Sequence, residues 1–142
     1  MFGSRQTMRK LALAGIAVAV TALFPSIASA AWLGYKNETN AIIVVQSAAV
    51  VNGQVIRGKP HQLYPGEVAW DTVPQPGVRQ VSIFDPRANN RLVAQDNVNC
   101  TGNDLFLSVQ VETPPPPRPG QPAQPPRVKL VPSKPTTPPP AK

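Results

Sequence analysis

Proline is concentrated at one end of this 142-residue chain. Thirteen of the last thirty residues are proline, in the segment TPPPPRPGQPAQPPRVKLVPSKPTTPPPAK. Proline fixes φ and has no backbone N–H, so a segment this rich in proline favours an extended, polyproline-II-like arm over a helix or a sheet. We therefore expect residues 113–142 to be a disordered tail with too little apolar surface to join a core. The apolar patch VKLV at 128–131 is either a docking strand or incidental, and the surrounding composition favours the second.

The first thirty residues have the composition of a secretory signal peptide. Arg5, Arg9 and Lys10 supply a positive start, LALAGIAVAVTALF is apolar, and PSIASA ends in the A-x-A arrangement that precedes cleavage. The apolar run is shorter than the roughly 20 residues that span a bilayer, which argues against a membrane anchor. We therefore expect residues 1–30 to be removed and the protein to be exported to the periplasm or the cell exterior, with no transmembrane segment left after cleavage at Ala31.

Residues 31–112 alternate between apolar and polar in short runs. LFLSVQV at 105–111 and VRQVSIF at 78–84 have the period of two that is typical of β-strands. Asn52-Gly53 lies between two β-branched runs and is a strong hairpin signal. About six or seven such strands, spaced roughly ten residues apart, predict an all-β fold. We expect a small antiparallel β-sandwich, immunoglobulin-like or cupredoxin-like but without a metal site, followed by the disordered tail.

Few side chains in this domain suit catalysis or metal binding. His61 is the only histidine and Cys100 the only cysteine of the chain. Mononuclear copper sites use two imidazoles with a thiolate, and structural zinc sites use about four nitrogen or sulfur ligands. We therefore predict no metal, no cofactor and no enzymatic activity. Cys100 has no partner for an intramolecular disulfide, so it is either buried or pairs between chains, and burial is favoured.

A small hydrolase or cofactor-binding protein is the alternative. It would use His61 together with Asp71, Asp85 or Asp96, since histidine is the commonest general base. The observation that separates the two classes is whether these titratable side chains converge in one concave site. The seven acidic residues of 31–112 are spread along the chain, which gives no sign of a cluster.

Aromatic side chains are the usual platform for sugars in exported β-sandwiches. Trp70 alternates with Val68 on one face and is expected in the core, whereas Trp32 and Tyr35, near the new N-terminus, are the expected exposed pair. Two N-x-T sequons are present, one of them starting at Asn37. We interpret both as coincidence, because the alanine-rich export signal is bacterial in character.

The net charge of +7 comes from the two ends of the chain. Residues 31–112 hold six basic and seven acidic side chains, so the predicted domain is nearly neutral and does not resemble a nucleic-acid-binding fold. The tail holds five cations and no carboxylate. A cationic arm is attracted to anionic polymers and surfaces with a strength that falls as salt is raised. The candidate contact residues are Arg118, Arg127, Lys129, Lys134 and Lys142.

The stretch GYKNETNAIIVVQSAAVVNGQVIRGKPHQLYPGEVAWDTV resembles a group of uncharacterised exported bacterial proteins with one small β-domain. In that group the hairpin, the RGKPH loop and the PGE-AWD segment recur. The resemblance covers about residues 34–107 and implies a secreted all-β domain. It carries over no catalytic or metal-binding residue, and the proline-rich tail lies outside it.

Together these features favour a non-enzymatic interaction module in the envelope or outside the cell. The β-sandwich would bind an envelope or extracellular macromolecule, and the tail would contact an anionic partner. The competing interpretation of the tail is a solubilising spacer with no partner of its own.

The first prediction concerns export. Material recovered from outside the cytoplasm is expected to begin at Ala31, because the positive start, the apolar stretch and the A-x-A site together direct cleavage there. N-terminal sequencing measures this directly. Recovery of the intact residues 1–30 in the membrane fraction would contradict it.

Overall fold

The computed structural model describes residues 30–141 of the chain. The predicted signal peptide, apart from Ala30, lies outside the described residues, as does Lys142. Within the described part, no helix is long and apolar enough to cross a membrane.

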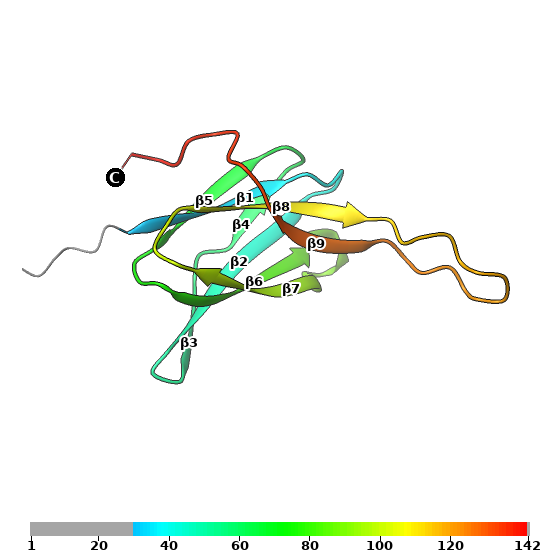
Figure 1. The fold of residues 1–142 in the computed structure, drawn as a ribbon, viewed down its shortest axis with the longest axis horizontal. Helices are drawn as coiled ribbons and strands as arrows, with labels where there is room; N and C mark the ends of the chain where they lie inside the picture. The colour runs from blue at the N-terminus through cyan, green and yellow to red at the C-terminus, as the bar shows by residue number, and fades with distance from the viewer. Residues whose placement is uncertain (1–29, 142) are drawn as a thin grey trace, which may run out of the picture.

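Residues 30–141 form nine strands and one short 3₁₀ helix (Figure 1). Each strand is a short alternating run, and turns rich in glycine, proline or asparagine separate most of them. The hairpin turn after the second strand is one example, since Asn52 and Gly53 both have positive φ, as the Asn-Gly signal predicts. The elements are β1 (Ala31–Asn37), β2 (Ile43–Val51), β3 (Gln54–Arg57), β4 (His61–Leu63), β5 (Val68–Val73), β6 (Gly77–Asp85), the 3₁₀ helix η1 (Pro86–Ala88), β7 (Arg91–Cys100), β8 (Leu105–Glu112) and β9 (Arg127–Pro132).

The strands form two sheets that share one apolar core. Sheet A has the order β5-β1-β8-β9, and sheet B has the order β3-β2-β6-β7, with β4 also paired to β2. The side chains between the sheets come from both of them, among them Leu33 and Val109 of sheet A and Val45, Val81 and Ile83 of sheet B. This arrangement confirms the predicted all-β fold and is that of a β-sandwich.

Among the strands of the described residues, the pairing is antiparallel with one exception. β1 pairs with β8 in parallel, with Leu33 opposite Leu105 and Asn37 opposite Val109. The sequence-based expectation of a wholly antiparallel sandwich is therefore wrong at this pair. A parallel pair needs a long crossover, and here the whole of sheet B is built between the two strands. Local alternation gives no indication of such a pairing.

The second correction concerns the tail. Residues 127–132, expected to be disordered, form β9, which pairs antiparallel with β8 from Leu107↔Pro132 to Glu112↔Arg127. Val128 and Leu130 are half-buried against the core. The first five residues of β9, RVKLV, contain no proline, and Pro132 stands at the end of an edge strand, where a missing N–H is tolerated. The VKLV patch is thus a docking strand, and the sandwich extends beyond residue 112.

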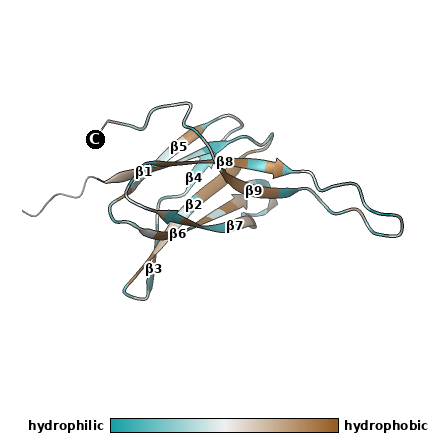
Figure 2. Ribbon diagram, in the orientation of Figure 1, coloured by the Kyte–Doolittle hydropathy of each residue, from teal (hydrophilic) through white to brown (hydrophobic). Residues whose placement is uncertain are grey.

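Residues 113–126 and 133–141, on either side of β9, contain no strand or helix. Residues 113–126 form a long loop that projects away from the two sheets and carries little hydrophobic colour (Figures 1 and 2). After β9, the backbone N–H of Ser133 donates to the carbonyl oxygen of Phe106 at 2.9 Å, and its Oγ lies 2.8 Å from that of Ser108. The C-terminal segment therefore starts in contact with β8.

The second prediction follows from β9. Removal of residues 113–142 is expected to lower the free energy of unfolding by about 2 kcal/mol, because the half-buried Val128 and Leu130 are lost and β8 becomes an open edge. Denaturant unfolding of both forms measures the difference.

The matched control keeps β9 and replaces residues 115–124 with a Gly-Ser linker of equal length. Its stability should stay within about 0.5 kcal/mol of the wild type, because the replaced residues are exposed. Equal stability of the truncated and full-length chains would show that β9 contributes nothing to the fold.

Candidate functional site

A polar cluster centred on Asp71 lies between the two sheets. Four strands contribute to it: Tyr35 from β1, Ser47 from β2, His61 from β4 and Asp71 from β5. The hydroxyls of Tyr35 and Ser47 each donate to Asp71 Oδ2 at 3.1 Å. His61 Nε2 lies 2.5 Å from Asp71 Oδ1. One carboxylate thus accepts hydrogen bonds from strands of both sheets.

The cluster is largely shielded from solvent. Tyr35 is fully buried and Ser47 is 2% exposed, while the side chains of His61 and Asp71 are 19% and 14% exposed. Gly58 packs beside Ser47, where a Cβ atom would come within 3.0 Å of Ser47 Oγ. Any larger residue at position 58 would therefore press on the cluster. This explains the glycine in the RGKPH segment.

The geometry of the cluster indicates a structural role, in which Asp71 connects strands of the two sheets. In Ser-His-Asp catalysis the imidazole lies between the hydroxyl and the carboxylate and takes the hydroxyl proton. Here the carboxylate is in the middle, and both Ser47 and His61 bond to it. Ser47 is also too buried to meet a substrate. What the arrangement provides is an acceptor for buried donors, which would be costly to leave unpaired.

The acids proposed as partners of His61 are only partly brought together. Asp71 meets His61, as described. Asp85 instead accepts from the backbone N–H of Arg87 at 2.9 Å and so caps η1. Asp96 lies on β7 and accepts from the N–H of Asn97 at 2.8 Å. The described residues contain no group of three or more His, Cys, Asp and Glu side chains placed to hold a metal ion.

Tyr35 corrects the sequence-based view of the aromatic residues. It points into the core, whereas it was expected to be exposed, and Trp32 beside it is half-buried. Trp70, expected in the core, instead lies on the other face of sheet A, with its ring 5.3 Å from that of Phe106. Gly34 makes room for both rings, since a Cβ there would come within 2.5 Å of Trp70. The alternation of AWLGYKN, with Leu33 inward, was the signal that could have placed these residues.

Burial and charge also act on the titration of Tyr35. Burial, followed by the negative charge of Asp71, raises the pKa of the Tyr35 phenol well above its usual value. Burial likewise raises the pKa of the Cys100 thiol, which is 2% exposed. Both groups are thereby held in the neutral form.

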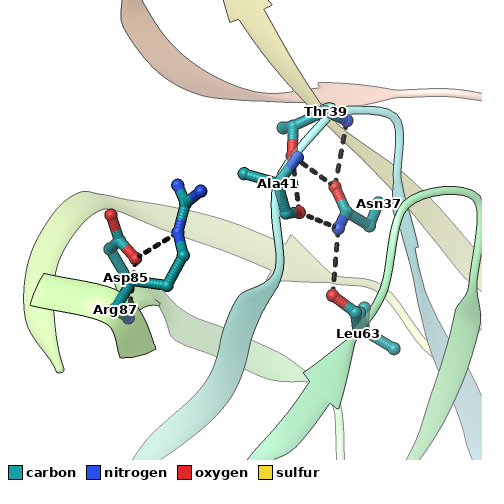
Figure 3. Close-up of polar contacts among 6 residues, drawn as sticks. All are labelled: Asn37, Thr39, Ala41, Leu63, Asp85 and Arg87. Atoms are coloured by element: carbon teal, nitrogen blue, oxygen red, sulfur yellow. Dashed lines mark hydrogen bonds and ion pairs between the residues drawn. The ribbon is translucent and has the colours of Figure 1, made fainter.

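A second polar cluster fixes the loop after β1 (Figure 3). The Asn37 side chain is fully buried and donates to the carbonyl oxygens of Ala41 at 2.7 Å and Leu63 at 3.0 Å. Its Oδ1 accepts from the backbone N–H of Thr39 at 2.9 Å. The sequon at Asn37 is therefore structural, because a buried and fully bonded amide has no room for a glycan.

The cations proposed as a contact surface are spread over the C-terminal region. Arg118 is in the projecting loop, Arg127 and Lys129 are on β9, and Lys134 follows it. Lys142 lies outside the described residues. Lys129 Nζ is 2.9 Å from Glu112 Oε1, so its charge is partly neutralised. The four cations within the described residues thus lie on three successive segments: the loop, β9 and the stretch that follows β9.

The fold also separates charge between the sheets. Of the six basic residues between positions 31 and 112, five lie in sheet B or its connections: Arg57, Lys59, Arg79, Arg87 and Arg91. Of the seven acidic residues in the same range, only Asp85 and Asp96 lie there. Sheet B is therefore net positive. The net charge of residues 31–112 is close to zero and does not reveal this asymmetry.

No protein-family model, curated protein or solved structure matches this chain.

The third prediction concerns Tyr35. In a Tyr64→Phe variant Tyr35 is the only tyrosine. Its tyrosinate absorbance is expected to be absent at pH about 10, where a free phenol titrates, and to appear only on unfolding. The raised folded-state pKa contributes stability that is complete below the unfolded pKa. As the pH rises beyond that value, the contribution falls by up to about 1.4 kcal/mol per pH unit.

The control is the same variant in denaturant, where the phenol should titrate near pH 10. Ionisation of Tyr35 at this pH in the folded protein would contradict the buried, Asp71-facing position.

Proposed function

We propose that the protein is an exported, non-enzymatic interaction module that contacts anionic envelope or extracellular polymers. Its fold would be a small sandwich of the immunoglobulin-like or cupredoxin-like kind without a metal site. The observation that carries the proposal is the shape of the C-terminal region. β8 and β9 hold the two ends of a proline-rich loop and present it clear of the sheets, with Arg118 in the loop and Arg127 and Lys129 on β9 (Figure 1).

The loop between β8 and β9 is suited to contact by its exposure and rigidity. Prolines restrict its backbone, so less conformational entropy is lost when it meets a partner. Arg118 stands at a turn in this loop, where the N–H of Gln121 donates to the Arg118 carbonyl at 2.9 Å. The side chain is exposed and the loop contains no carboxylate to neutralise it. An exposed cation at a turn of a projecting loop is well placed for an anionic partner.

The separation of charge supports the same partner class. Sheet B adds a cationic side to the domain, so attraction to a polyanion is not confined to the C-terminal region. Each cation close to an anionic surface contributes about 1 kcal/mol, screened over roughly 8 Å at physiological salt. Several cations on one molecule would give measurable, salt-sensitive binding.

The proposal assigns no reaction to the Asp71 cluster. Its carboxylate is surrounded by donors, and its one candidate nucleophile, Ser47, is buried. We interpret the contact between His61 and Asp71 as the link between β4 and β5 that closes one side of the sandwich.

The fourth prediction concerns the five C-terminal cations. Replacing Arg118, Arg127, Lys129, Lys134 and Lys142 with Gln is expected to weaken binding to polygalacturonate at least tenfold, because each contributes a screened attraction. Wild-type binding should fall steeply as salt is raised. Binding isotherms at several salt concentrations measure both effects.

The matched control scrambles residues 113–126 and leaves β9 intact. It should bind as the wild type does, because screened attraction depends on charge and not on order. If the five-Gln variant binds polygalacturonate as the wild type does, the C-terminal region is only a spacer.

A further inference from the structure

The outer face of sheet B carries a groove without an assigned role. Two adjoining cavities of about 200 and 450 Å³ share the lining residues Gln46 and Phe84. They lie on the face that points away from the core. Arg57 is the only charged residue lining either of them.

Strand register arranges this groove in rows. Gln46 of β2 lies opposite Ser82 of β6, and Ser82 lies opposite Gln95 of β7, which gives a polar row across three strands. One step along the strands, Phe84 lies between Val44 and Leu92 in an apolar row. Neighbouring strands are about 4.8 Å apart, so a chain lying across them would meet a side chain at each interval of this size.

A bulge makes the apolar row possible. The pairing between β6 and β7 shifts by one residue after Ile83, which pairs with Ala94, so that Phe84 pairs with Leu92. Without the bulge, strict alternation would place Leu92 on the same face as Ala94, toward the core. Leu92 is instead 48% exposed next to Phe84.

The groove differs from an ordinary solvated face in its lack of ion pairs. The outer face of sheet A carries Lys36 with Glu38 at 3.3 Å and Lys129 with Glu112 at 2.9 Å. In place of such ion pairs, the groove has the amides of its glutamines and the hydroxyl of Ser82. Surfaces that bind partners are depleted in paired charges and keep polar groups that can both donate and accept, as amide side chains do.

We propose that this groove binds an acidic polysaccharide, with Arg57 pairing with a uronate carboxylate. Gln80 and Gln95 hydrogen-bond the hydroxyls, and Phe84 and Leu92 pack against the apolar face of a sugar ring. The inference rests on the proposed function for the anionic class of the partner and names the site and the repeating unit. Arginine forms two parallel hydrogen bonds with a carboxylate, which makes it suited to this role.

The choice of a glycan over a protein partner follows from the backbone. The groove lies on the face of sheet B, over β2 and β6, whose main chains are paired on both sides, and the open edge of β7 lies to the side of the sheet rather than under the groove. Recognition there depends on side chains alone, whereas extended peptides commonly bind by adding a strand to a free edge. The occupant must offer hydroxyls to amides and a carboxylate to Arg57. A uronate chain has both.

The test uses short oligogalacturonate and, as matched ligand, the same oligomer with its carboxylates reduced to alcohols. Calorimetry with the exported protein should give binding of the acidic oligomer. Arg57→Gln should weaken this binding about tenfold or more, the scale of one charge-assisted pair. It should leave the weak binding of the reduced oligomer unchanged. Gln80→Ala with Gln95→Ala should weaken the binding of both oligomers.

The control variant is Gln110→Ala, which removes an amide from sheet A, where it donates to Glu38 at 2.7 Å. It should bind the oligomer as the wild type does, and thermal melts should show that all variants are folded. If the groove variants bind the oligomer normally and the five-Gln variant does not, the site is the C-terminal region and the groove inference is wrong. If the wild type binds long polygalacturonate but no short oligomer, the groove inference also fails and the proposed function stands. If the wild type binds neither the long polygalacturonate nor the short oligomer, both the groove inference and the proposed function are wrong.

Discussion

The carboxylate of Asp71 is the contact on which this sandwich most depends. It stands where four strands of two sheets meet and accepts hydrogen bonds from Tyr35, Ser47 and His61. A charge shielded from water is costly unless it is well bonded, and a buried hydroxyl is costly without an acceptor. Each group therefore compensates the burial of the others. β4 has three residues, so its position depends strongly on the contact between His61 and Asp71.

The opposite side of the sandwich is closed by β9, and this determines what the proline-rich sequence can do. Prolines keep residues 113–126 out of the sheet, while the proline-free start of β9 allows six residues to rejoin it. A free tail of thirty residues could extend about 90 Å, but a fourteen-residue loop held at both ends reaches only about 20 Å. The direction in which this loop can make contact is therefore set by the orientation of the sheets that hold its two ends. Its partner must come close to the domain.

The net positive charge and the amide-lined groove both belong to sheet B, so the two sheets differ in the surface that they offer to an anionic partner. Within residues 31–112 five of the six basic residues lie in sheet B or its connections, and the outer face of this sheet also has the amide-lined groove, while five of the seven carboxylates lie in sheet A or the loops that adjoin it. An anionic chain drawn to the protein would meet sheet B on the side that offers hydrogen bonds. Long-range attraction sets the encounter rate, and short-range hydrogen bonds set the specificity. The two proposals are therefore complementary, since one concerns attraction and the other recognition.

The sequence by itself determined the class of fold and many of its inward-facing residues. Alternation in 78–84 predicted a strand with Val81 and Ile83 on one face, the face that is buried in the structure, and Asn52-Gly53 marked the hairpin, because both signals act between neighbours in the chain. It also named Asp71 as a possible partner of His61, but only as one of three acids, together with Asp85 and Asp96, and it did not distinguish among them. What it did not determine was the parallel pairing of β1 with β8 or the docking of β9, since both join segments distant in sequence.

Only the tertiary structure decided what the polar residues do. Asp71 could be recognised as an acceptor for three donors only when four strands had been brought together. The groove likewise depends on a bulge in β7 and on register across three strands, and the positive side of the domain depends on which strands share a sheet. Local pattern specifies which face of a strand is apolar. The identity of the strand that lies opposite is set by packing, and it is there that the buried polar cluster, the groove and the charge asymmetry arise.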